Sequence, residues 1–138
     1  MSQANDKSRH KILPPQYVGA LPAAGLTTLE QLAITQGARV IHIHLNACKN
    51  QKEVLQTIGK ALRFPAYFGE NLDALYDCLT DHMVTSVRAE DHGVLIVLHQ
   101  LSTLTALDQE QRELLLDVFR DAADFHSELR RIFQVLWD

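Results

Sequence analysis

The sequence predicts an α/β fold, a small three-stranded parallel sheet flanked by helices, and two observations support it. First, three short segments, 40–45, 93–98 and 132–137, have the β-branched or nearly unbroken apolar composition of buried strands. Second, the stretches between these segments repeat apolar residues at helical spacing. Because helical crossovers join strands in parallel, the three strands are expected in one sheet with right-handed connections.

Residues 1–38 are expected to form an N-terminal extension of a domain that spans residues 39–138. Polar residues and a proline pair open the extension and predict a partly flexible lead-in. Residues 17–26 contain glycine and proline and are interpreted as a loop. Thr28 would then cap a short helix that ends at Gly37. Two roles stay open for the extension, covering an edge of the sheet or contacting a second partner.

Two helices of the domain carry clear start signals. Asn50 followed by Glu53 is typical of a helix N-cap, and the helix that begins there is expected to end before Pro65. Asp108 and Gln111 have the spacing of a capping box at the start of a long helix near the end of the domain. The predicted order from residue 40 onward is strand, helix, helix, strand, helix, strand.

The composition excludes several classes of protein. Of 138 residues, 46% are hydrophobic and 22% are charged, which is typical of a soluble globular domain and not of a disordered chain. No apolar stretch approaches the roughly 18 residues that span a membrane, and the N-terminus lacks the apolar segment of a secretory signal peptide. We therefore expect a cytoplasmic protein, in which Cys48 and Cys78 are buried thiols.

The charge is distributed unevenly along the chain. Residues 1–63 carry 8 Lys and Arg against 3 Asp and Glu, whereas residues 64–138 carry 5 against 14. The second part is therefore strongly acidic, although the net charge of the whole chain is only −4. An acidic surface repels nucleic-acid phosphates and attracts basic proteins. The charge pattern thus favours a basic protein partner and disfavours direct binding of nucleic acid.

The most informative segment is a helix expected from about residue 71 to residue 83. Its leucines recur at helical spacing and predict a buried stripe. Another face then gathers two carboxylates, an aromatic ring and a hydroxyl: Asp73, Tyr76, Asp77 and Thr80. Carboxylates around an aromatic ring are typical of a protein-recognition surface. From spacing alone, a solvated helix face explains these residues equally well.

Catalysis and metal binding have weaker support in the sequence. Asp73 and Asp77 lie on adjacent helical turns, with no positioned histidine and no third ligand nearby in the sequence. His42 and His44 would share one face of a strand, but this spacing alone is weak evidence for a metal, and structural histidines are favoured. Cys78 has no neighbouring base that would make it a nucleophile. We therefore expect no enzyme, no metal and no cofactor.

A family resemblance rests on residues 64–80, Phe-Pro-Ala-Tyr-Phe-Gly-Glu-Asn-Leu-Asp-Ala-Leu-Tyr-Asp-Cys-Leu-Thr. This segment resembles the loop and helix of the barstar family, the intracellular ribonuclease inhibitors. Residue types are retained at Pro65, Tyr67, Gly69, Glu70, Asn71, Leu72, Asp73, Ala74, Leu75, Asp77, Cys78, Leu79 and Thr80. Residues 117–122 resemble a second, weaker segment of the family. The order of the predicted elements over 40–137 also agrees with the barstar-like fold.

The resemblance implies a stoichiometric inhibitor of a basic, guanyl-specific ribonuclease of the barnase type, an antitoxin or immunity protein. In such inhibitors, carboxylates take the place of RNA phosphates in the active site of the enzyme. Asp77 would enter the phosphate-binding pocket, Asp73 would meet basic residues at its rim, and Asp121 is the acidic position of the later helix. The partner-binding residues implied are Tyr67, Gly69, Asn71, Asp73, Tyr76, Asp77, Thr80 and Asp121.

The sequence also departs from the family pattern. Tyr76 stands where a Trp is common, Phe68 lacks the hydroxyl of the usual second Tyr, and Asp121 is shorter than the usual Glu. Tyr76 and the N-terminal extension keep an alternative open, a barstar-fold interaction module that binds a different basic protein or toxin. A small metal-dependent hydrolase that uses Asp73, Asp77 and a histidine is the least favoured alternative.

Overall fold

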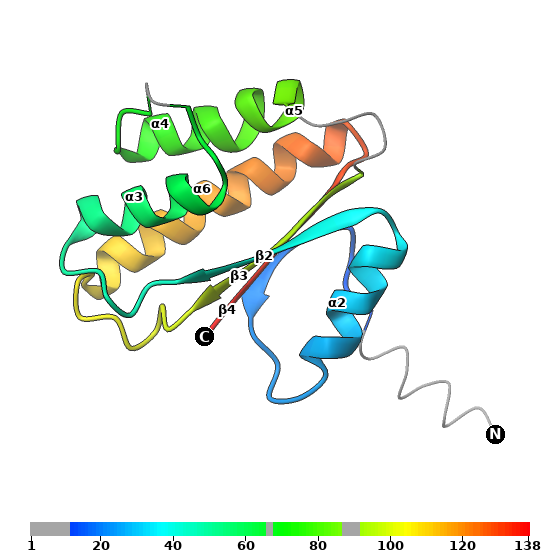
Figure 1. The fold of residues 1–138 in the computed structure, drawn as a ribbon, viewed down its shortest axis with the longest axis horizontal. Helices are drawn as coiled ribbons and strands as arrows, with labels where there is room; N and C mark the ends of the chain where they lie inside the picture. Colours follow the sequence, from blue (N-terminus) through cyan, green and yellow to red (C-terminus); the bar gives the residue numbers. More distant parts are fainter. Residues whose placement is uncertain (1–11, 66–67, 87–91) are drawn as a thin grey trace.

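The sheet has four parallel strands and not the three that the sequence predicts (Figure 1). The computed structural model describes residues 12–65, 68–86 and 92–138. Among these residues the strand order is β1-β4-β3-β2. The strands are β1 (Gln16–Ala20), β2 (Ala38–His44), β3 (Gly93–His99) and β4 (Ile132–Trp137). The α/β class, the parallel arrangement and the three predicted strands are confirmed, and the expected number of strands is wrong.

The additional strand, β1, lies in the segment that the sequence suggested was a lead-in and a loop. It pairs in parallel with β4 and forms an edge of the sheet. Two side-chain hydrogen bonds also hold it there. The side-chain amide of Gln16 donates to the Arg131 carbonyl at 2.8 Å, and the side-chain amide of Gln134 donates to the Pro14 carbonyl at 2.9 Å. A strand of five residues with a proline before it and a glycine within it has little intrinsic preference for this conformation. Pairing with β4, which the local sequence does not reveal, stabilises it.

The helices cover the two faces of the sheet unequally. Figure 1 shows α3, α4, α5 and α6 on one face and α2 on the other. The helices are α2 (Leu26–Thr35), α3 (Gln51–Ala61), α4 (Leu72–Asp77), a π-helical turn η1 (Cys78–His82), α5 (Met83–Ser86) and α6 (Gln109–Glu128). The predicted helix over 71–83 is therefore a continuous run of α4, η1 and α5. No described helix is long and apolar enough to cross a membrane.

Most of the predicted helix boundaries are confirmed. The Asn50 side chain accepts a hydrogen bond from the backbone N–H of Glu53 at 2.9 Å and caps α3. Asp108 and Gln111 form a reciprocal capping box at the start of α6. The start of α2 differs, because the helix begins at Leu26 after a left-handed Gly25 and includes Thr28. Gly37 does follow the end of this helix, in a left-handed conformation that suits glycine.

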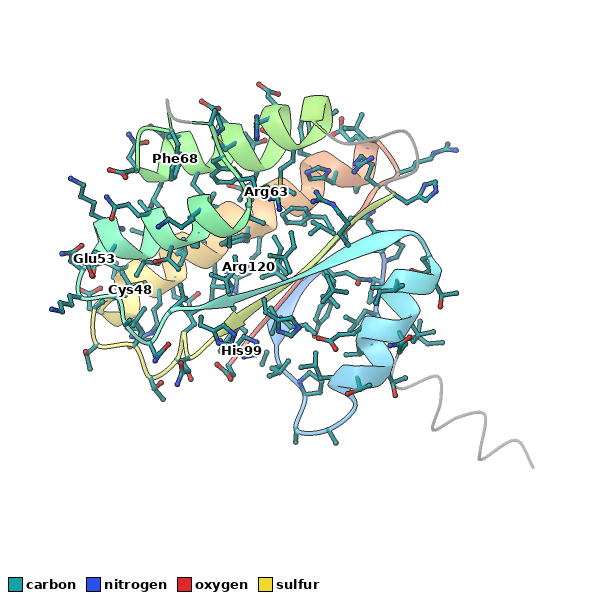
Figure 2. All side chains as sticks on the ribbon, viewed as in Figure 1. Cys48, Glu53, Arg63, Phe68, His99 and Arg120 are labelled. Atoms are coloured by element: carbon teal, nitrogen blue, oxygen red, sulfur yellow. The ribbon has the colours of Figure 1, made fainter. Side chains whose placement is uncertain are left out.

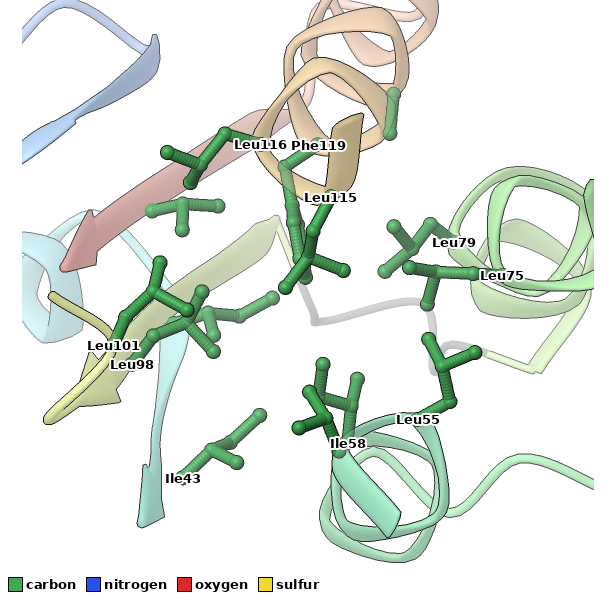
Figure 3. Close-up of a cluster of buried hydrophobic side chains, with 14 of the residues drawn as sticks. Ile43, Leu55, Ile58, Leu75, Leu79, Leu98, Leu101, Leu115, Leu116 and Phe119 are labelled. Atoms are coloured by element: carbon green, nitrogen blue, oxygen red, sulfur yellow. The ribbon is translucent and has the colours of Figure 1, made fainter. Parts of the chain in front are cut away.

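Two apolar clusters lie on opposite faces of the sheet. The larger cluster joins β2, β3 and β4 to α3, α4 and α6 and includes Ile43, Leu55, Ile58, Leu75, Leu79, Leu98, Leu115, Leu116 and Phe119 (Figure 3). The smaller cluster joins Leu29 and Ala33 of α2 to Leu95, Val97 and Leu136 of the sheet. Because residues Gly93–Leu98 of β3 are all buried, β3 is covered on both faces, as its unbroken apolar composition predicts.

Candidate functional site

An acidic groove of about 590 Å³ runs between α4 and α6. Its lining contains five carboxylate residues, two aromatic residues and two aliphatic residues, and no Lys or Arg is among the described residues that form it. The lining is Leu72, Asp73, Tyr76, Asp77, Val118, Asp121, Asp124, Phe125 and Glu128. The structure thus brings Asp73, Tyr76 and Asp77 together with Asp121, which lies more than forty positions away in the sequence.

The α4 side of the groove depends on a cap at Asn71. The Asn71 side chain accepts a hydrogen bond from the backbone N–H of Ala74 at 2.8 Å, which fixes the first turn of α4. Asp73 lies in this first turn, where the partial positive charge of the helix terminus stabilises a carboxylate. Leu75 is buried beneath it, and this orients Asp73 and Asp77 to solvent, where both are exposed. Asn71 therefore positions the acidic face, in addition to its predicted role in the loop.

Thr80 is not part of the exposed face, contrary to the prediction from helical spacing. Its side chain is 2% exposed, and its hydroxyl donates to the Tyr76 carbonyl at 2.8 Å. The helix widens into the π-helical turn at Cys78, so residues after Asp77 no longer follow the spacing of 3.6 residues per turn on which the prediction rests. Thr80 shapes the helix under the groove in this structure and does not line the groove.

A buried histidine of α6 supports the π-helical turn. His126 is 2% exposed, its Nε2–H donates to the Leu79 carbonyl at 2.8 Å, and its ring stacks on Phe133 with centroids 4.7 Å apart. Burial lowers the pKa of His126, so the neutral ring is favoured, and the nearby Arg131 lowers it further. A neutral ring with its proton on Nε2 therefore joins α6 to the helix that carries Asp77.

The α6 side of the groove contains more acidic residues than Asp121, the only one predicted from the sequence. Asp121, Asp124 and Glu128 recur at helical spacing and are all exposed, and Phe125 lies among them. On another part of α6, Arg120 Nη1 lies 2.7 Å from Asp117 Oδ1 and 3.7 Å from Glu113 Oε1. Neither of these acidic partners lines the groove. The spacing of Asp121, Asp124 and Glu128 is a signal that could have found this extension.

The loop before α4 carries an exposed glycine, Gly69. At Gly69 the backbone is not left-handed, and an added Cβ would make only ordinary contacts with its neighbours. The fold itself therefore does not require glycine here, whereas a partner backbone could approach this exposed position closely. Phe68 packs edge-on against Phe64, with centroids 5.2 Å apart, and over Gly59. Tyr67, which the resemblance assigns to partner contact, lies outside the described residues.

Two other candidates from the sequence form no catalytic arrangement in the described residues. His42, His44 and His99 form a stack in which His42 Nδ1 and His99 Nε2 are 2.7 Å apart, and His42 Nε2 lies 2.6 Å from Glu30 of α2. Across residues 12–65, 68–86 and 92–138, no group of three or more His, Cys, Asp or Glu residues is arranged to hold a metal ion. Burial raises the pKa of the Cys78 thiol, and Asp77 raises it further, so a thiolate is disfavoured.

The fold and the groove together define an α/β protein that presents an acidic, aromatic-lined surface between two helices. The family model described as Barstar (barnase inhibitor) matches residues 38–138. This chain therefore belongs to the barstar family. β1 and α2 precede the matched region, so the family match covers three strands of the sheet and the helices on its larger cluster.

Comparisons with individual proteins add information on the fold. Phosphoglycerate kinase from Borrelia duttonii (strain Ly) is 34% identical over 80 residues, which are 56% of this chain and 20% of the kinase. The chain thus spans only a fifth of the length of that relative. The ORC2 protein of Aeropyrum pernix, solved as ADPNP-ADP complexes, is similar with a TM-score of 0.51 and 18% identity, over 88% of this chain and 33% of that chain. Its similarity shows the fold alone.

Proposed function

We propose that this protein is a stoichiometric inhibitor of a guanyl-specific ribonuclease of the barnase type and acts in the cytoplasm of the cell that makes it. One observation carries the proposal: in a chain of the Barstar (barnase inhibitor) family, the α4–α6 groove gathers Asp73, Asp77 and Asp121 around Tyr76. A ribonuclease active site is basic because it binds phosphates, so it is complementary to this groove in charge.

The mechanism that we infer is occupation of the active site by carboxylates in place of RNA phosphates. Asp77 is at the C-terminal end of α4 and exposed, which suits it to enter a cationic pocket. Asp73 and Asp121 flank it and would pair with basic residues at the rim. Tyr76 and Phe125 add apolar area among these charges, as aromatic residues do at the centre of protein interfaces.

The proposal is tested by calorimetric titration of a barnase-type ribonuclease with the protein and two variants. We expect Asp77→Asn to weaken binding by at least about 2 kcal/mol, roughly thirtyfold, because a partner cation would remain buried and unpaired. Glu110→Gln is the matched control, since it removes the same charge from an exposed position of α6 outside the groove. Equal losses of affinity in the two variants would exclude Asp77 as the central contact.

A second candidate function, the binding of a different basic protein, is favoured by the composition of the far end of the groove. Asp124, Phe125 and Glu128 extend the acidic surface along α6 beyond Asp121. If the ribonuclease does not bind, capture of basic proteins with the wild type but not with the double variant Asp124→Asn and Glu128→Gln would support this alternative. Capture by both proteins alike would exclude the far end of the groove as the site.

A further inference from the structure

A second groove follows the outer edge of the sheet, along β2. Two cavities, each of about 490 Å³, meet at Ala61 of α3. One is lined by the first residues of β2, by Ile34 of α2 and by the end of α3, and the other by the last residues of β2 and the body of α3. Together they extend along the full strand, and they share no residue with the acidic groove.

The edge of β2 has unused backbone hydrogen-bonding capacity. In the described residues β2 pairs only with β3, and no strand lies on its other side. The backbone N–H of Leu45 donates to the His99 carbonyl at 3.2 Å. Because backbone groups alternate in direction along a parallel strand, Ile41 and Ile43 share the orientation of Leu45, and the backbone groups of Val40 and His42 point outward.

The groove has the chemistry of a site for an extended chain. Ile34 is 53% exposed, and Val40, Ile41 and Leu62 are partly exposed along the edge. The β2 sequence Ala-Arg-Val-Ile-His-Ile-His contains no proline, a residue with which edge strands avoid pairing. A seven-residue strand spans roughly 23 Å at about 3.3 Å per residue, which is long enough to pair with an extended peptide.

The charge of this groove selects the kind of partner. Arg39, Lys60 and Arg63 line it, and Glu53 is its one acidic residue among the described positions. The carboxylate of Glu53 accepts the backbone N–H of Lys49 at 2.8 Å, at the start of α3, while Arg63 follows the other end of that helix (Figure 2). A second copy of this chain would bring the same positive edge against it, which like-charge repulsion disfavours.

We propose that an extended, acidic segment of another polypeptide binds the β2 edge as an additional strand. Its backbone would pair with the outward groups of Val40 and His42, and its carboxylates would meet Lys60 and Arg63. The site is independent of the proposed ribonuclease inhibition, because the two grooves use different elements. The protein would then hold a basic partner on α4 and α6 and an acidic partner on β2.

Fluorescence anisotropy with a labelled probe tests the proposal. The probe is a capped octapeptide of alternating Val and Glu, and its control is the same peptide with Lys for Glu. We expect the Glu peptide to bind and the Lys peptide to bind at least about tenfold more weakly, because the groove is basic. No binding of the Glu peptide, or equal binding of the two peptides, would overturn the proposal.

Two kinds of variant separate strand pairing from general charge attraction. Val40→Pro removes an outward N–H without removing a hydrogen bond between β2 and β3, and Lys60→Glu with Arg63→Glu reverses the charge of the groove. We expect each to lower the affinity of the probe about tenfold or more. Lys49→Glu with Lys52→Glu, beside the groove but not in its lining, reverses the same number of charges and should lower the affinity much less.

Retained binding in a folded Val40→Pro variant would contradict strand addition. The charge-reversed variant keeps the test valid even if Val40→Pro fails to fold, since unchanged binding there would also overturn the proposal. Analytical ultracentrifugation completes the experiment. A dimer that forms at rising concentration and disappears in Val40→Pro would show that a second copy, and not an acidic partner, occupies the edge.

Discussion

Individual side chains connect the interior of this protein to its acidic groove. His126 is the clearest example, because its ring binds the Leu79 carbonyl on the helix that carries Asp77 and stacks on Phe133 of β4. Among the described residues its Nδ1 is buried without a hydrogen-bond partner, so protonation would place an unpaired charge in the core. The sequence shows a histidine in an amphipathic helix, but only the tertiary contacts give it this role.

The buried His126 predicts a loss of stability in mild acid. Burial lowers the pKa of His126 in the folded state below the ordinary value of about 6.5, so the unfolded chain binds more protons. The stability that this group contributes is therefore complete above about pH 6.5 and falls as the pH drops toward the folded pKa, by at most about 1.4 kcal/mol per pH unit.

Urea unfolding at several pH values measures this loss of stability, and His126→Gln should reduce the slope of the unfolding free energy against pH. The slope would be unchanged if His126 were solvated. Burial also lowers the pKa of His99, so some dependence remains in the variant.

Helix caps show how far local sequence determines the elements of this fold. The caps at Asn50 and at Asp108 with Gln111 are both predicted and observed. In each of their hydrogen bonds the donor and the acceptor are only three residues apart, so the local sequence determines them. The helix predicted from about residue 71 to residue 83 is observed as a run from Leu72 to Ser86, but its π-helical turn is not predicted. That turn depends on packing against α6, and it moves Thr80 from the expected exposed face into the core.

The capping box predicts a specific stability effect at the start of α6. Asp108→Ala removes the side-chain acceptor for the backbone N–H of Gln111 and should lower the free energy of unfolding by about 1 kcal/mol. Chemical denaturation measures the change, with Glu110→Gln as a variant in the same turn that keeps the cap. Because Asp108 does not line the groove, binding of a partner should be unaffected in the folded protein. An unchanged unfolding free energy would show that the cap contributes nothing.

The described part of the chain is organised around one sheet, to which β1 belongs. β1 covers the edge of β4, and α2 covers the face that the family-matched helices leave open. The sequence left the role of residues 1–38 open because β1 pairs with a strand more than a hundred residues later. Prediction of the acidic groove was limited in a similar way. The residue spacing predicted the acidic face of α4, whereas only the fold places that face beside Asp124, Phe125 and Glu128.

The integration of the N-terminal segment predicts a large effect of a single truncation in α2. Leu29 is 5% exposed and packs against β3 and β4, so Leu29→Ala should destabilise the protein by about 2–5 kcal/mol. Ile34→Ala on the same helix removes comparable apolar area from a side chain that is 53% exposed and should have a much smaller effect. Thermal unfolding of both variants measures the difference. Similar melting temperatures for the two would mean that α2 contributes little to the fold.

The most direct measurement is RNA cleavage by a barnase-type ribonuclease, followed as this protein is added in increasing molar ratio. A stoichiometric inhibitor that occupies the active site through the acidic groove should abolish cleavage at one equivalent. With Asp77→Asn, cleavage should persist at that ratio, while Glu110→Gln should inhibit as the wild type does. Full cleavage activity in the presence of excess wild-type protein would contradict the proposed function, and the acidic groove would then be assigned to another basic partner.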